Sequence, residues 1–95
     1  MAEEKRDSNI IYIGKKEAMS YVLAIATQFK SGAKEVVVKA RGNSISRAVW
    51  ISEVTRLKFI RESAVKEVKI GTDEVQDSNG RMSKVPFINI TLAVK

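Results

Sequence analysis

Lysine and arginine side chains gather in two short segments that each follow an apolar run and each contain a glycine. Lys15 and Lys16 follow Gly14, and Arg41 stands directly before Gly42. Their ammonium and guanidinium groups are suited to holding phosphate oxygens, and a helix start adds unpaired backbone N–H groups. The residue types therefore predict phosphate binding by two loops. Each loop taken alone also fits a purely structural role, because a glycine and a polar cap are what any tight strand-to-helix connection needs.

The hydrophobic patterns predict how the two basic loops are placed in the fold. Residues 9–13 and 34–40 read as β-strands, and residues 17–31 read as a helix with apolar residues at spacings of three and four. Residues 45 to 59 or 60 read as a second helix, with a less regular apolar pattern. Two parallel strands joined by a helix form a right-handed βαβ unit. Both basic loops would then lie at the same edge of the sheet, and this convergence matters more than either loop alone.

Each predicted helix carries a further expectation. We expect Asn43 or Ser44 to cap the second helix, and Arg47 falls in its first turn, where it adds a third cation to the same edge. The first helix has an apolar face wider than the single stripe that a surface helix needs, because Tyr21 and Ile25 extend it. We therefore expect the first helix to pack on the sheet and also to meet another subunit.

The C-terminal third predicts a hairpin that projects as an arm. Residues 65–70 and 87–94 read as strands, since apolar and polar residues alternate in both. Asn79-Gly80 is the strongest hairpin signal in the chain, because both residues tolerate the positive φ of a two-residue turn. Residues 72–85 contain few apolar side chains, so this segment cannot be packed in a core.

The predicted arm carries charges of both signs. Arg81 and Lys84 are cations on a structure thin enough for a minor groove about 6 Å wide, where arginine is favoured. Asp73, Glu74 and Asp77 on the ascending strand offset those two charges. A hairpin that is merely solvated therefore fits the arm as well as a nucleic-acid contact does.

The elements together predict an α/β chain of the two-layer α+β kind, in the order β-α-β-α-β-β. It has a four-stranded mixed sheet, two helices and a long protruding hairpin. Residues 1–8 read as a disordered tail and residues 9–95 as one domain. The chain has 17 Lys and Arg against 11 Asp and Glu, and residues 14–47 hold five of the six net positive charges. A polyanion is the natural partner of such a region.

The amino-acid composition disfavours several classes of function. The chain has neither cysteine nor histidine, which disfavours disulfides, a zinc site and thiol or imidazole catalysis. We expect no enzyme, no metal and no cofactor, with a lysine-based catalyst as the remaining enzymatic alternative. No apolar run approaches the length that spans a bilayer, and the charged start does not resemble a signal peptide. We expect an intracellular protein with no membrane partner.

The aromatic residues divide into two groups. Tyr12 and Phe87 lie in strands that look half-buried, and Phe29 belongs to the apolar stripe of the first helix, so a platform for stacking single-stranded bases is disfavoured. Phe59 lies among basic residues at the end of the second helix, where it either plugs its own domain or marks a protein contact. Trp50 has the same two interpretations, with core packing favoured.

Six segments of the chain carry a resemblance to a known family: Asn9–Lys16, Met19–Ala24, Glu35–Gly42, Ile45–Ala48, Arg56–Phe59 and Asn79–Arg81. The match runs in order, without large gaps, over roughly residues 9–95, and two of its basic motifs each end a predicted strand. Together these segments resemble the Alba family of archaeal chromatin proteins.

The resemblance implies a domain similar to the C-terminal domain of a bacterial translation initiation factor. It also implies a homodimer that binds DNA, and often RNA, with little sequence preference. Lys15 and Lys16 would be the main phosphate contacts, and Lys15 corresponds to a lysine whose acetylation weakens DNA binding in some members, which adds a sirtuin-type deacetylase as a partner. Arg41 would contact the backbone, and Phe59 would sit between dimers.

Two residues depart from the family pattern. Asn43 stands where a basic residue is common, and Trp50 where a charged one is frequent, so the central patch is weaker and the contact between dimers could be remodelled. The nucleic-acid contacts expected from motif and position are Lys15, Lys16, Arg41, Asn43, Arg47, Arg81 and Lys84.

The leading hypothesis is a homodimeric chromatin or nucleoid protein of the cytoplasm that coats or compacts double-stranded DNA. It would bind without sequence preference, through backbone contacts and minor-groove arms, and dimers would assemble further on the DNA. The chief alternative is a protein that acts on structured RNA, since basic loops spaced across a dimer could also follow an A-form helix. A protein-interaction adaptor using the apolar end of the second helix is the third.

Overall fold

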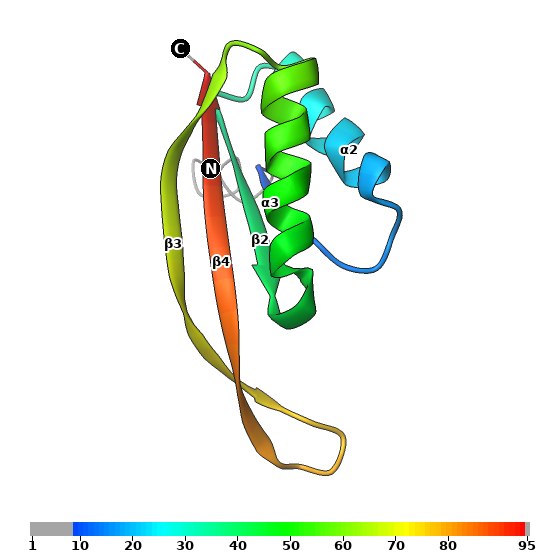
Figure 1. Cartoon of the computed structure of the whole chain (residues 1–95), viewed down its shortest axis with the longest axis vertical. Helices are drawn as coiled ribbons and strands as arrows, with labels where there is room; N and C mark the ends of the chain where they lie inside the picture. Colours follow the sequence, from blue (N-terminus) through cyan, green and yellow to red (C-terminus); the bar gives the residue numbers. More distant parts are fainter. Residues whose placement is uncertain (1–8, 95) are drawn as a thin grey trace.

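A computed structural model describes residues 9–94 of the chain, and it shows a single four-stranded mixed sheet with two helices (Figure 1). The predicted fold class and order of elements are confirmed. The predicted tail, residues 1–8, lies outside the described residues. In chain order the elements are β1 (Ile10–Tyr12), α2 (Ala18–Lys30), β2 (Glu35–Arg41), the 3-10 turn η1 (Gly42–Ser44), α3 (Ile45–Val54), the π-helical turn η2 (Thr55–Phe59), β3 (Ser63–Gln76) and β4 (Met82–Val94).

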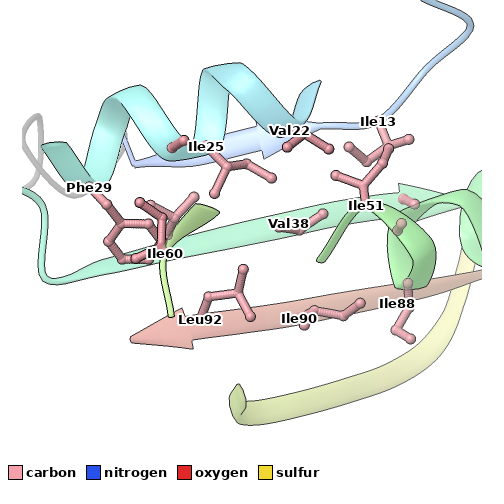
Figure 2. Packing of buried hydrophobic residues seen from close by; sticks show 14 residues of the cluster. Ile13, Val22, Ile25, Phe29, Val38, Ile51, Ile60, Ile88, Ile90 and Leu92 are labelled. Carbon is pink, nitrogen blue, oxygen red and sulfur yellow. The ribbon is translucent and has the colours of Figure 1, made fainter. Parts of the chain in front are cut away.

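The strands follow the order β1-β2-β4-β3 across the sheet. β1 pairs with β2 in parallel, as expected for strands joined by a helix, and the other two pairings are antiparallel. Alternate residues of β2 and β4, such as Val38 and Ile90, are buried against Val22, Ile25 and Ile51 of the helices (Figure 2). The helices therefore cover one face of the sheet, and the core lies between the two layers.

The hairpin strands are longer than the sequence pattern predicts. β3 and β4 remain paired from the sheet out to Gln76 and Met82, so the predicted arm, residues 72–85, is a two-stranded ribbon that extends beyond the rest of the molecule (Figure 1). Cross-strand hydrogen bonds hold this ribbon together even though it has little apolar content. Inside the described part, no helix is long and apolar enough to cross a membrane.

The turn at the end of the arm differs from the predicted two-residue turn. Gly80 has a φ of 83°, but Asn79 does not adopt a positive φ. The carboxylate Oδ1 of Asp77 accepts hydrogen bonds from the backbone N–H groups of Asn79 and Arg81, both at 2.9 Å. This Asp side chain favours a longer loop, because it satisfies the backbone donors that a two-residue turn would have paired across the strands.

β3 is an edge strand with an exposed apolar strip on its helix side. Val65, Val68 and Ile70 lie opposite Leu92, Ile90 and Ile88 of β4 in the antiparallel register, so they share the face on which the core lies. α3 packs over β2 and β4, and the strip residues are 41%, 53% and 75% exposed. The alternation predicted for residues 65–70 is interrupted by a bulge between Val65 and Glu67. We call Val65, Val68 and Ile70 the β3 strip.

Candidate nucleic-acid interface

The structure brings the two basic loops to the same edge of the sheet. Tyr12 of β1 lies level with Lys39 of β2, and the backbone N–H of Ile13 donates to the Lys39 carbonyl at 2.9 Å. Because neighbouring strands are about 5 Å apart, the loop that follows β1 leaves the sheet beside Arg41 at the end of β2. Lys15, Lys16 and Arg41 are all exposed there, and we call this end of the sheet the basic edge.

Two side chains from the helices fix the shape of the Lys15-Lys16 loop. The hydroxyl of Tyr21 in α2 accepts hydrogen bonds from the backbone N–H groups of Gly14, at 2.9 Å, and Lys16, at 3.2 Å. The guanidinium of Arg47 in α3 donates to the carbonyl of Gly14, at 2.8 Å, and to that of Lys16. The same guanidinium lies 5.9 Å from the centre of the Tyr21 ring, within the range of a cation–π contact. We call this pair the Tyr21–Arg47 clamp.

The clamp changes the roles that the sequence suggests for its members. Arg47 was expected to contact phosphate, but its guanidinium already binds two loop carbonyls, so its first effect is to hold the loop in place. Tyr21 was expected only to widen an apolar helix face, and sequence reasoning missed its part in the site. The available signal was its hydroxyl, since a partly buried tyrosine usually finds a hydrogen-bond partner.

Removing the Tyr21 hydroxyl is expected to loosen the loop. In Tyr21→Phe the N–H groups of Gly14 and Lys16 lose their acceptor, which should lower the free energy of unfolding by about 1 kcal/mol. Denaturant unfolding and amide hydrogen exchange at Gly14 and Lys16 measure the two effects. Tyr12→Phe is the control, because it removes an exposed phenol from the neighbouring strand. Unchanged exchange at Gly14 in Tyr21→Phe would show that the clamp does not order the loop.

Arg41 lies at the basic edge, beside the base of the arm. Its Nη1 is 3.9 Å from Oδ2 of Asp73, and both side chains are about half exposed, so this pair contributes little to stability and Arg41 can exchange it for a phosphate. Gly42 has a φ of 56°, and a Cβ placed there would lie 3.4 Å from Cγ1 of Val85. The turn after β2 therefore packs closely against β4 where the arm begins.

The predicted cap of α3 is wrong. Neither Asn43 nor Ser44 makes a side-chain cap hydrogen bond. Both lie in η1, which runs directly into α3, and the backbone N–H of Ile45 donates to the Gly42 carbonyl instead. Ser44 has helical backbone angles, and so cannot take the extended conformation in which a capping side chain turns back to the helix. Asn43 is exposed beside Arg41.

The cations predicted for the arm are exposed on it. Lys84 lies opposite Glu74 in the register of the ribbon, and Arg81 belongs to the terminal loop. Two of the three acids that were expected to offset them have other neighbours as well: Asp73 pairs with Arg41, and Asp77 holds the turn backbone. The charges of the arm are therefore only partly cancelled within it.

The structure corrects two of the aromatic assignments. Tyr12 is 69% exposed, not half-buried, because no helix covers its side of the sheet. Trp50 is 52% exposed on α3, so the favoured core interpretation is wrong. Phe87 is half-buried and Phe29 buried, as expected.

Phe59 lies where α3 ends in the wide turn η2. The backbone N–H of Ile60 donates to the Thr55 carbonyl at 2.8 Å, which is the five-residue spacing of a π-helix. Ile60 is buried, while Phe59 is 39% exposed. Ile60 therefore fills the base of the core, and Phe59 keeps part of its ring at the surface.

The ion pairs that shift a pKa lie away from the basic edge. The Glu35 carboxylate hydrogen-bonds the Lys66 ammonium and raises the pKa of Lys66. The hydrogen bond from Arg56, at 2.7 Å, lowers the pKa of the Glu53 carboxyl and raises the pKa of Arg56. The Glu53 contribution to stability is therefore present above its ordinary pKa and lost as the pH falls. It is small, because the pair is on the surface.

Comparison with known proteins points to one family. The Alba family model matches residues 9–72. The chain is 47% identical to the DNA/RNA-binding protein Alba of Thermoplasma acidophilum over 98% of this chain and 99% of that protein. It is 48% identical to the protein of the same name from Methanococcus maripaludis over 88% and 96%. The structure of Alba from Thermoplasma volcanium superimposes with a TM-score of 0.85 and 46% identity, covering 90% of this chain and 99% of that one.

Proposed function

Because this chain belongs to the Alba family, we propose that it binds nucleic acid, and that double-stranded DNA is the ligand to which its basic edge is best suited. Relatives that match nearly the whole chain are named DNA/RNA-binding proteins. The observation that carries the proposal is the basic edge itself. There the clamped loop with Lys15 and Lys16 lies beside Arg41 and the base of the arm.

The chemistry of this edge favours binding without sequence preference. Lys15, Lys16 and Arg41 are exposed cations on backbone turns, and such groups bind phosphates, which carry no sequence information. The arm from Thr72 to Gln76 has five paired residues per strand, so it extends about 16 Å at about 3.3 Å per residue. It can follow a minor groove and place Arg81 there, where arginine is favoured. Asn43 adds a neutral hydrogen-bonding group at the same edge.

We place the homodimer contact at the β3 strip. Its three apolar side chains are exposed along an edge strand, and a self-complementary contact across a two-fold axis would cover them in both subunits. Pairing of two such chains would also double the number of basic edges and arms. The wide apolar face of α2 also predicts a contact with another subunit. That contact would be smaller than the one at the β3 strip, because Met19 and Leu23 are the large apolar residues that α2 leaves exposed.

Phe59 is proposed as a contact between dimers on DNA. We expect Phe59→Ala to reduce the cooperativity of binding to a long duplex about threefold and to change the affinity for a short duplex less than twofold. Truncating a partly exposed contact residue outside the hot spot of an interface costs about 0.5–1 kcal/mol. Titration of both duplexes by fluorescence anisotropy measures the two quantities. Val49→Ala, which truncates an exposed apolar residue on α3 that has no part in the proposed contacts, is the control. Unchanged cooperativity in Phe59→Ala would remove Phe59 from this role.

Lys15 is proposed as a site of regulation by acetylation. Acetylation would remove its charge and one phosphate contact, and a sirtuin-type deacetylase would restore both. This part of the proposal rests on the family resemblance and on the exposure of Lys15 in the loop. A protein with this function would be located in the cytoplasm, bound to the chromosome.

The proposed function is tested by titrating unrelated duplexes at several salt concentrations. About six phosphate contacts per dimer predict a slope of about −5 for log affinity against log salt, with similar affinity for each duplex. Competition with structured RNA at fixed salt decides the alternative, because a preference for RNA above about tenfold would make RNA the main ligand. Affinity that does not change with salt would contradict phosphate binding and favour a protein-interaction adaptor.

A further inference from the structure

One face of the sheet is not covered by either helix, and a row of four side chains crosses it. In the strand register Tyr12 of β1 lies beside Lys39 of β2, Lys39 beside Asn89 of β4, and Asn89 beside Lys69 of β3. Paired residues point to the same side of a sheet, and this side is opposite to the one that carries the core. The row therefore presents an aromatic ring, an amide and two cations on one open surface.

The surface is hollowed around this row. A shallow pocket of about 660 Å³ is lined by Tyr12, Lys39, Arg41, Phe87 and Asn89, among others. That volume falls within the range of small-molecule sites, and the aromatic residues stand at two sides of it, on β1 and β4. Tyr12 is 69% exposed, an exposure at which its ring is open to a stacked partner.

A glycine in β3 gives the second aromatic its place. Gly71 lies opposite Phe87 in the register, and a Cβ at Gly71 would come within 2.6 Å of Cζ of the Phe87 ring. The ring of Phe87 therefore leans across the position that any other residue would fill. The absence of a side chain at Gly71 thus lets the Phe87 ring lie against the sheet, where it forms one wall of the pocket.

The charges around the pocket are those that an anionic backbone needs. Lys39 and Arg41 line it against one acid, Asp73, which pairs loosely with Arg41, and Lys69 lies next to Asn89 on the same face. Farther along the same face Glu35 pairs with Lys66, and Glu67, which lies opposite Thr91, adds a negative charge. Asn89 can both donate and accept hydrogen bonds. Aromatic, amide and cationic groups thus meet at one end of the face.

We propose that this open face is a second site, adjoining the basic edge at Arg41, that binds an unpaired base of single-stranded nucleic acid, with Tyr12 as the stacking residue. Stacking needs the flat side of a base, which a duplex buries between neighbouring pairs, so the site takes single strands. Lys39 and Lys69 hold the adjoining phosphates, and Asn89 bonds the edge of the base. Phe87 closes the far side of the pocket.

The test compares single strands with a duplex in the wild type and in Tyr12→Ala. Labelled twelve-nucleotide RNA and DNA strands of one sequence, and the DNA duplex of that sequence, are titrated by fluorescence anisotropy. Loss of one stacked base predicts roughly tenfold weaker single-strand binding and a change below twofold for the duplex. Tyr12→Phe should keep the single-strand affinity. Equal losses for all ligands, or no loss, would overturn the proposal, and a difference between the RNA and DNA arms would show which backbone the site prefers.

Two further variants separate stacking from general surface effects. Trp50→Ala is the matched control, because it removes an aromatic side chain that is 52% exposed on the other layer, and it should leave single-strand binding unchanged. Gly71→Ala displaces Phe87 and should weaken single strands but not the duplex. If duplex binding were absent while Tyr12 still governed single strands, the proposed function would fail and this site would stand. A second protein copy that protected Tyr12 without nucleic acid would identify the face as a protein contact instead.

Discussion

Replacing Lys15 and Lys16 together by glutamine is expected to lower the affinity for duplex DNA by about two to three orders of magnitude at about 0.1 M salt, because the proposed dimer would then lose four phosphate contacts. The salt slope should become shallower by about 3 to 4, close to one unit per lost contact. Both lysines are exposed, and the Tyr21–Arg47 clamp holds the backbone atoms of the loop, not the ammonium groups. The variant should therefore fold and pair normally. Anisotropy titration at four salt concentrations measures both quantities.

A matched control removes the same charge elsewhere. Lys30 ends α2 and Lys34 precedes β2, at the end of the sheet away from the basic loops. Lys30→Gln with Lys34→Gln changes the net charge equally, so it should weaken binding less than about fivefold if only long-range attraction is lost. Similar losses in the two double variants would show that overall charge matters and that the edge has no special role. Loss restricted to some duplex sequences would contradict backbone recognition.

The convergence of the basic loops could be predicted because it follows from topology alone. Once two strands joined by a helix are parallel, the residues after each must leave the sheet at the same edge. The clamp could not be predicted in this way. Arg47 lies 33 residues from Gly14 in the chain and Tyr21 lies seven, and their meeting depends on how α2 and α3 pack. A pattern of apolar residues gives the face of each helix, but not which polar atom near that face meets the loop.

The exposure of Tyr12 and of the β3 strip could not be predicted from the sequence, for a related reason. Alternating side chains in a strand indicate that one face is buried, but they do not show how far the covering layer extends. Here α3 lies over β2 and β4, so β4 is buried on its helix side as its pattern predicts, while the neighbouring Val68 and Ile70 remain exposed. Tyr12 stands on the other face, which neither helix reaches. The alternation of apolar and polar residues thus predicts which segments form strands, but it does not predict how much of each strand the helices cover.

The β3 strip leads to the second large effect. We expect Val68→Glu to convert the proposed dimer to a monomer at micromolar concentration, since an unpaired carboxylate buried in an apolar contact costs several kcal/mol. In a two-fold contact the substitution appears twice. Val68 is already half exposed in the single chain, so the monomer should still fold and unfold cooperatively, with a midpoint lowered only by the loss of the dimer contact. Sedimentation velocity and thermal unfolding measure these two properties.

The consequence for binding follows from the number of contacts. A monomer has one basic edge and one arm, so its salt slope should fall from about −5 to about −2.5, and its duplex affinity should fall by at least about a hundredfold. Ala64→Glu is the matched control, because Ala64 is exposed on the same strand but pairs with Ala93 on the opposite face. It should leave both assembly and affinity unchanged. A dimer that survives Val68→Glu would exclude the strip as the contact, and the exposed apolar residues of α2 and α3 would then be the surfaces to substitute next.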